Sequence, residues 1–271
     1  MFSKYIALWQ LSPDGPPIVT ATDRLLPVTR QGVPAMLKVA VHAEERAGNR
    51  LMSWWDGCGA ARVLAADDDA VLLERGCVSP SLADLSRAGR DDEASGIICA
   101  VIAKLHAVDR EKTAPPKVVP LARWCEELEL AATQGGILSH AAEAARDLLA
   151  SPREMVVLHG DVDHGNVLQF GPRGRLAIDP KGLWGERGFE YANVFCNPDV
   201  ETATEPGRLA RQATGVAAAA GLERARLLRW VLAYAGLSAA WSLGEGEPPT
   251  GSLQVAALAA AELNPEGAVV P

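Results

Sequence analysis

Three polar residues within positions 155–190 have side chains suited to phosphoryl transfer: Asp161, Asn166 and Asp179. The carboxylate of Asp179 and the amide oxygen of Asn166 are hard ligands of the kind that Mg²⁺ prefers, and such a metal neutralises nucleotide phosphates. The carboxylate of Asp161 can accept the proton of an attacking hydroxyl. Two oxygen ligands and a separate base together favour the transfer of a phosphoryl group from a nucleotide.

Short apolar runs must position these three side chains. Residues 155–158 read as a strand that leads into His159-Gly160-Asp161. Residues 167–170 and 175–178 read as two more strands, and the turn-forming residues 171–174 between them predict a hairpin that ends on Asp179. Since five steps let the chain turn after Asp161, we expect Asn166 to return beside it.

The composition is that of a globular protein with an acidic surface. The 271 residues suffice for one large domain or two lobes, and 48% hydrophobic with 22% charged residues is ordinary for a folded protein. A formal net charge of −8 argues against nucleic acid as a partner, because binding to a phosphate backbone needs a basic face. The surplus of carboxylates favours a cationic small-molecule substrate.

Neither the cysteines nor the apolar stretches indicate secretion or a membrane. The five cysteines are scattered and form no Cys-x-x-Cys pair, which predicts buried free thiols. No stretch reaches about 18 apolar residues, and the N-terminus lacks the pattern of a signal peptide. We expect a cytoplasmic protein without membrane contact, and the sequence leaves its oligomeric state open.

The N-terminal residues have the pattern of a small antiparallel sheet with one helix. Apolar runs alternate with turn signals from residue 4 to residue 41, so strands are expected there, the first at residues 5–11, and further strands at 61–65 and 70–74. Residues 43–55 read as a helix with Glu44 and Glu45 in its first turn, and either glutamate could be the ion-pair partner of a lysine on the preceding strand. Lys38, in the last run, either points outward from an edge strand or reaches a nucleotide phosphate.

Beyond a linker at residues 75–80 the pattern becomes helical. Helices are expected at 91–108, 120–133, 138–149, 203–220, 222–243 and 251–263. The chain is therefore expected to form an N-terminal nucleotide-binding lobe, residues 1–76, and a larger catalytic and substrate-binding lobe, residues 77–271.

These features together resemble the protein-kinase-like phosphotransferases of small molecules. The match is to the aminoglycoside phosphotransferases in particular, whose His-Gly-Asp loop corresponds to residues 159–161. Residues 178–186, 188–189, 192–193 and 237–241 are similar to the branch of streptomycin 6-phosphotransferases and hydroxyurea antibiotic resistance kinases. The resemblance implies a bilobal α+β fold, ATP and Mg²⁺ as cofactors, and transfer to a hydroxyl of streptomycin or a related aminoglycoside.

Carried over position by position, the resemblance implies a role for each polar residue. Asp161 becomes the catalytic base, and Asn166 and Asp179 become the Mg²⁺ ligands. Lys38 becomes the lysine that contacts the phosphates, with Glu45 as its partner. The backbone of a segment of the linker would bind the adenine: Leu73, Glu74, Arg75 and Gly76.

Two further residues are expected to have structural and not chemical roles. Glu190 falls where relatives have an acidic residue that braces the catalytic loop, and His159 is read as a packed scaffold residue. The chain also departs from the protein kinases. The hairpin near residues 21–29 contains no glycine, and Asp179-Pro180-Lys181 replaces Asp-Phe-Gly, so the activation switch of those kinases is not transferred.

The acceptor is the part of the function that the pattern resolves least. Acidic residues after the central segment are candidate contacts for a cation: Asp199, Glu201, Glu205, Glu245 and Glu247. A kinase of another small metabolite or of hydroxyurea is an alternative. A metallohydrolase is a weaker one, because no histidine follows His164 to complete a zinc site. A nucleotide-binding module without activity is a third, although it would have no use for Asp161.

Overall fold

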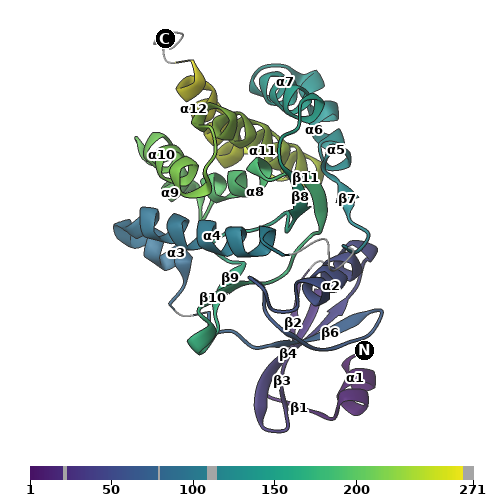
Figure 1. Cartoon of the computed structure of the whole chain (residues 1–271). Coiled ribbons are helices and arrows are strands. Elements are labelled where there is room, and N and C mark those ends of the chain that lie inside the picture. Colours follow the sequence, from purple (N-terminus) through teal and green to yellow (C-terminus); the bar gives the residue numbers. More distant parts are fainter. Residues whose placement is uncertain (21–22, 79, 109–114, 265–271) are drawn as a thin grey trace.

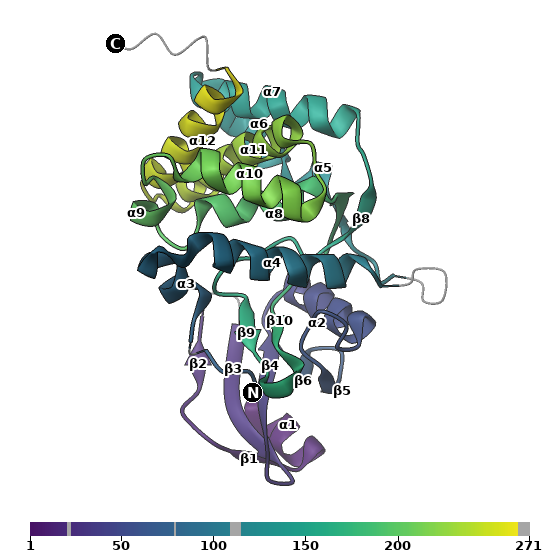
Figure 2. The same ribbon diagram turned by 60° about the vertical axis from the view of Figure 1, so that its left-hand side comes forward.

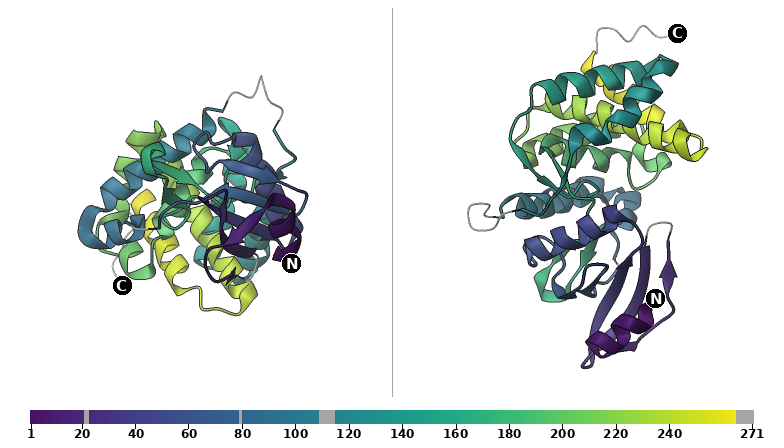
Figure 3. Two further views of the ribbon diagram at one scale, coloured as in Figure 1. Left: turned by 90° about the horizontal axis from the view of Figure 1, so that it is seen from below. Right: turned by 90° about the vertical axis from the view of Figure 1, so that its right-hand side faces the viewer.

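The structure is a computed structural model and describes residues 1–20, 23–78, 80–108 and 115–264. Figure 1 shows an antiparallel sheet from the N-terminal part of the chain at one end of the molecule and a larger assembly of helices at the other. In Figure 2 the helix α4 (Asp91–His106) runs between these two parts, and the right-hand view of Figure 3 shows the same separation from another direction. The expected α+β organisation in two lobes is confirmed.

The N-terminal sheet has six strands in the order β1-β3-β4-β6-β5, with β2 paired to β3, and every pairing is antiparallel. The strands are β1 (Leu11–Pro13), β2 (Ile18–Val19), β3 (Asp23–Arg30), β4 (Val33–Ala40), β5 (Val63–Ala66) and β6 (Ala70–Glu74). Lys38 lies opposite Leu25 on β3 and Val71 on β6, so it belongs to a central strand. The alternative of an outward lysine on an edge strand is therefore wrong.

Two helices pack with this sheet, where the pattern predicted one. Residues 5–11 were expected to form a strand, but the structure has a helix there, α1 (Phe2–Trp9), before β1. Tyr5 and Trp9, one helical turn apart, pack with their tilted rings 5.1 Å apart between centroids, and Tyr5 is buried with Leu37 and Val39. Because side chains alternate along a strand, Lys38 points to the opposite face of β4, toward α2 (Ala43–Trp55).

The C-terminal lobe is built around the long helix α11 (Arg224–Glu245), which contacts α7, α8 and α12. The other helices are α3 (Leu82–Leu85), α5 (Leu121–Trp124), α6 (Glu126–Ala131), α7 (Ile137–Ala150), α8 (Gly188–Ala192), α9 (Val200–Ala203), α10 (Arg208–Ala220) and α12 (Thr250–Leu263). Short helical turns of other types lie at Ser86–Arg90, Ala132–Gln134, Gly171–Arg173 and Asn193–Cys196.

Most of the expected helices form, and two are interrupted. The helix expected at 120–133 divides into α5 and α6, which meet at Cys125. The helix expected at 203–220 begins only at Arg208, because Pro206 and Gly207 separate it from α9, and Gly207 has a φ of 76°. A proline restricts the residue before it to non-helical conformations, which accounts for this break.

Short strands connect the two lobes. β8 (Met155–Leu158) and β7 (Val119–Pro120) flank β11 (Leu183–Glu186), and β9 (Val167–Gln169) and β10 (Arg175–Ala177) form the predicted hairpin. This hairpin is tied to the N-terminal part by backbone hydrogen bonds from Ala61 to Ala177 and from Ala177 to Gly59, and to the linker by bonds in both directions between Cys77 and Gln169. The loops before and after the hairpin are thereby held against the sheet.

A large core runs through both parts of the chain. Leu51, Met52 and Trp55 of α2 belong to the same buried cluster as Ile98 of α4 and Val231 of α11. This continuity keeps α2 in a fixed position relative to the C-terminal helices. Among the described residues, no helix combines the length and the apolar character needed to cross a membrane.

Candidate active site

The loop that carries Asp161 is held by a buried carboxylate on α8. The backbone N–H groups of His159 and Gly160 donate to the two oxygens of Glu190, at 2.6 and 2.8 Å. Burial opposes the charged form of Glu190, but hydrogen bonding and charge from His106 outweigh it and lower the pKa of the glutamate. Gly160 has a φ of 87°, which L side chains rarely adopt, so this loop needs glycine before the aspartate.

His159 joins this loop to the segment that follows β10. Its ring Nε2 lies 2.8 Å from the carbonyl oxygen of Ile178, and its own carbonyl accepts hydrogen bonds from the N–H groups of Lys181 and Gly182, at 2.7 and 3.1 Å. The ring also stacks on Trp55 of α2, with centroids 5.9 Å apart. Burial lowers the pKa of His159 and favours the neutral ring. These contacts are those of a scaffold residue.

The Asp161 carboxylate is oriented by two amide side chains. Oδ2 accepts a hydrogen bond from Nδ2 of Asn166 at 3.1 Å, and Oδ1 accepts one from Nδ2 of Asn193 at 3.0 Å. Burial, with a contribution from the charge of Asp163, raises the pKa of Asp161 to about 7. A carboxylate in such surroundings is a stronger base than one exposed to water.

Asn166 and Asp179 are brought together by the hairpin. The N–H of Ile178 donates to the carbonyl of Asn166 at 2.9 Å, and Asp179 follows directly, with a φ of 62°. Oδ1 of Asp163 accepts from the N–H groups of Gly165 and Asn166, both at 2.8 Å, and so closes the turn before Asn166. Aspartate tolerates the left-handed conformation better than most residues do.

The chemistry of this pair fits a divalent cation. Nδ2 of Asn166 is directed to Asp161, which leaves the amide oxygen as the group that can face a metal. Asp179 has a second carboxylate oxygen besides the one that contacts Lys38, and hard oxygen donors are what Mg²⁺ requires. Within the described ranges, no group of three or more His, Cys, Asp or Glu side chains could hold a metal, as a metallohydrolase would require.

Lys38 forms ion pairs with residues from both lobes. Its Nζ lies 2.7 Å from Oε2 of Glu45 on α2 and also contacts Oδ1 of Asp179, and Lys38 and Glu45 are both buried. Glu44, the other candidate partner, instead lines the cavity described below. Lysine, glutamate and aspartate therefore meet at the junction of β4, α2 and the hairpin.

Lys181 is a further cation at this junction, and no role was predicted for it. Its Nζ lies 3.1 Å from Oε1 of Glu45, so one glutamate bridges two lysines. Burial opposes the charged form of Lys181, but Glu45, Asp179 and Asp161 outweigh it and raise the pKa of the lysine. Its position two residues after Asp179 is the feature of the sequence that could have placed Lys181 at this site.

The segment predicted to bind adenine links the sheet to the hairpin. Leu73 is buried at the end of β6, and the Glu74 side chain accepts from the N–H of Arg62 at 2.6 Å. The Arg75 guanidinium pairs with Asp14 at 2.5 Å. A Cβ on Gly76 would lie 2.8 Å from the Phe170 ring, so the linker passes close against β9 at this point.

A cavity of about 560 Å³ opens beside Asp161. Its lining includes the loop that carries Asp161, three glutamates and three aromatic side chains: Glu44, Arg123, Trp124, Glu127, Gly160, Asp161, Lys181, Tyr234, Ser238, Trp241, Ser242 and Glu245. A second hollow of about 670 Å³ shares Glu127, Trp241 and Glu245 with it and extends away from the loop. These two hollows, which share the acidic residues Glu127 and Glu245, are together called the groove below.

The acidic residues proposed for the acceptor do not all lie in this groove. Glu245 lines both hollows. Asp199 instead caps α9 by accepting from the N–H of Thr202 at 2.9 Å, and it pairs with Arg87 at 2.7 Å. Glu201, Glu205 and Glu247 are absent from the lining of either hollow. The groove is also lined by Glu44 and Glu127, which were not predicted to contact the acceptor.

This fold, with a lysine–glutamate pair facing an aspartate loop and a second aspartate, defines a protein-kinase-like phosphotransferase. A family model described as aminoglycoside/hydroxyurea antibiotic resistance kinase matches residues 8–246, and the chain belongs to this family. The resemblance inferred from the sequence is thus confirmed.

Individual relatives agree with this membership. The streptomycin 3''-kinase of Klebsiella pneumoniae is 49% identical over 88% of this chain and 91% of its own length. The streptomycin 6-kinase of Streptomyces glaucescens is 28% identical over 88% of this chain and 80% of its own. A thermostable mutant of the aminoglycoside phosphotransferase APH(4)-Ia, solved with ADP and hygromycin B, shares the fold with a TM-score of 0.65 at 16% identity and 99% coverage of both chains.

Proposed function

We propose that the protein transfers the γ-phosphoryl group of ATP to a hydroxyl of streptomycin, and that this hydroxyl is the 3''-hydroxyl. The observation that carries the proposal is the 49% identity to a streptomycin 3''-kinase, which extends over nearly the whole length of both chains. The acidic groove beside Asp161 supports it, because a polycationic acceptor needs carboxylates.

In this proposal the oxygen of the acceptor hydroxyl attacks the γ-phosphorus of ATP, and Asp161 accepts the proton of that hydroxyl. The bond between the γ-phosphorus and the oxygen that stays with ADP breaks at the same time. Lys38 and Lys181, which both pair with Glu45, would balance the negative charge of the phosphates. Asn166 and Asp179 would hold Mg²⁺, which supplies charge neutralisation of the phosphates when bound. Glu45 pairs with both lysines and would hold their ammonium groups in position for the phosphates.

We further propose that residues 1–76 act as the nucleotide-binding lobe and 77–271 as the catalytic and substrate-binding lobe. The backbone of Leu73, Glu74, Arg75 and Gly76 would bind the adenine, as in the resemblance to related kinases. Exchange of these backbone amides with solvent deuterium should slow when ATP and Mg²⁺ are added. Unchanged exchange across the linker would remove it from the nucleotide site.

The size and lining of the groove favour a large cationic acceptor over hydroxyurea. Hollows of about 560 and 670 Å³ match the pockets that usually bind drug-sized ligands. Hydroxyurea has only a few heavy atoms and no positive charge, so it would leave most of the carboxylates without a partner. Trp124, Tyr234 and Trp241 offer faces on which a cation or a sugar ring can pack.

A screen of acceptors by ADP release tests this function. Streptomycin, hygromycin B and hydroxyurea are each offered with ATP and Mg²⁺, and the Asp161→Asn variant reports release that does not depend on the base. We expect acceptor-dependent release with streptomycin alone. Release with hydroxyurea alone would favour the alternative kinase, and ATP binding without release for any acceptor would favour an inactive nucleotide-binding module.

A further inference from the structure

A chain of hydrogen bonds runs from Asp161 away from the groove. Asn193, just after α8, donates from Nδ2 to Oδ1 of Asp161 at 3.0 Å. Asn197 donates from its own Nδ2 to the side-chain Oδ1 of Asn193 at 2.8 Å and to the carbonyl of Asn193 at 3.0 Å. Both asparagine side chains thus donate hydrogen bonds in the direction of Asp161.

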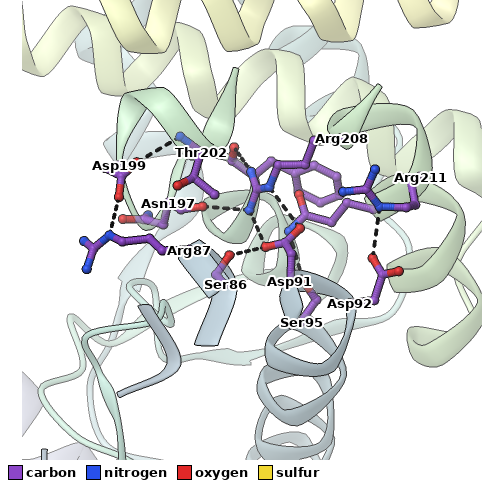
Figure 4. A network of polar contacts seen from close by, with 12 residues as sticks. Ser86, Arg87, Asp91, Asp92, Ser95, Asn197, Asp199, Thr202, Arg208 and Arg211 are labelled. Atoms are coloured by element: carbon purple, nitrogen blue, oxygen red, sulfur yellow. Dashed lines mark hydrogen bonds and ion pairs between the residues drawn. The ribbon is translucent and has the colours of Figure 1, made fainter. Parts of the chain in front are cut away.

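The far end of the chain is a buried ion pair between α10 and α4. Arg208 is only 1% exposed and donates to the carbonyl of Asn197 at 2.8 Å and to that of Phe195 at 3.3 Å. Its other contacts are with both carboxylate oxygens of Asp91, at 2.9 Å each, and Ser86 contacts the same carboxylate. Figure 4 shows the guanidinium of Arg208 between Asp91 and Asn197, with Ser86 beside Asp91.

The direction of the hydrogen bonds gives this arrangement a chemical consequence. An asparagine amide can present either its nitrogen or its oxygen to a neighbour, and an oxygen facing Asp161 would repel the carboxylate. Because Asn197 donates to Oδ1 of Asn193, only the nitrogen of Asn193 remains to face the base. Arg208 holds the backbone of Asn197 from the other side.

We propose that Asn193 and Asn197 are positioning residues that hold the Asp161 carboxylate in the orientation for proton transfer, and that the Arg208–Asp91 pair anchors them. This inference rests on the proposed role of Asp161 as the base. Neither asparagine lines the groove, so both act through Asp161 and not by contact with the acceptor.

A double-mutant cycle measured on kcat tests whether Asn197 acts on Asp161 through Asn193. Asn193→Ala and Asn197→Ala should each lower kcat by roughly 10- to 10²-fold, as expected for a displaced catalytic group, with an unchanged KM for ATP. If Asn197 acts through Asn193, the double variant loses no more than Asn193→Ala alone. Losses that multiply, or variants as active as the wild type, would overturn the proposal.

Two matched variants separate positioning from general stability. Arg208→Lys keeps the charge but loses the forked contacts, and we expect it to lower kcat. Arg211→Ala removes the exposed pair with Asp92, at 3.5 Å between the same two helices, and should leave kcat unchanged. Equal losses in both variants would mean that contact between α4 and α10, and not the chain to Asp161, controls turnover.

A structural readout keeps this inference distinct from the proposed function. In a crystal structure of Asn193→Asp, which is isosteric and replaces the donor by a carboxylate, we expect Asp161 to turn away from position 193. An unchanged Asp161 would contradict the inference even if the wild type proved inactive on streptomycin. Inactivity of the wild type itself would count only against the proposed function.

Discussion

Replacing Gly48 by alanine should displace the helix that carries Glu45. Gly48 lies three residues after Glu45 on α2, so both are on one face of the helix, and its Cα packs against the carbonyl oxygen of Pro180. A Cβ there would overlap that backbone oxygen, which cannot move aside as a flexible side chain can. Either α2 or the segment between Asp179 and Lys181 must shift.

Two opposing effects set the magnitude. Alanine in place of glycine within a helix gains roughly 0.5–1 kcal/mol, because the unfolded chain loses freedom. Overpacking in a close contact costs about 1–3 kcal/mol. We therefore expect Gly48→Ala to lower the free energy of unfolding by about 1–2 kcal/mol, since its steric cost exceeds the gain in propensity. Movement of Glu45 relative to Lys38 should also lower kcat/KM by roughly 10- to 10²-fold.

Urea unfolding and steady-state kinetics measure both effects, and Gly96→Ala is the matched control. Gly96 is an exposed glycine within α4, and a Cβ at that position meets nothing within 4 Å. The control should be more stable than the wild type and fully active. If Gly48→Ala behaves like Gly96→Ala, the close packing of α2 on Pro180 does not position Glu45, and the reasoning is refuted.

Three further predictions concern the base, the groove and the buried ion pair. Asp161→Asn should lower kcat by about 10²- to 10⁴-fold without change in ATP affinity, measured by calorimetry, and near-native turnover would exclude it as the base. Glu127→Gln and Glu245→Gln should each raise KM for streptomycin but not for ATP, and a salt-independent KM would argue against electrostatic recognition. Burial opposes ionisation of Asp91, but hydrogen bonds and charge from Arg208 outweigh burial and lower the pKa of this carboxyl in the folded protein. The stability that the ionised Asp91 contributes is therefore complete above the unfolded pKa of about 3.9 and is lost as pH falls toward the lower folded pKa. Unfolding of Asp91→Asn should depend less steeply on pH in that window, and an unchanged slope would contradict this.

Features set by local sequence were predicted well. The hairpin of β9 and β10, the strand β8 and the loop at Asp161 depend on short apolar runs and turn residues, which interact mostly with near neighbours. The strand at residues 5–11 was wrong because Tyr5 and Trp9 also fit a helical repeat, and burial against the sheet decides between the two periods.

Features set by packing could not be read from the chain. Lys181 meets Glu45 across 136 residues, and the distance is closed only when α2 docks on the hairpin. The position of Asn193 near the Asp161 loop could have been suspected from the sequence, because Asn193 lies three residues, or about one helical turn, after Glu190. The acids of the groove come from α2, α6 and α11, whose relative placement no sequence pattern fixes. Glu127 was therefore not among the predicted acids, and Asp199, which was, pairs with Arg87 and does not line the groove.

The most direct test of the account is the identification of the reaction product. Purified protein is incubated with streptomycin, ATP and Mg²⁺, and the product is analysed by mass spectrometry and phosphorus NMR, with Asp161→Asn in parallel. We predict streptomycin carrying a single phosphoryl group on the 3''-hydroxyl, formed by the wild type and nearly absent with the variant. A product phosphorylated elsewhere would contradict the assigned hydroxyl, and no phosphorylated streptomycin, or equal amounts with both proteins, would contradict the central claim.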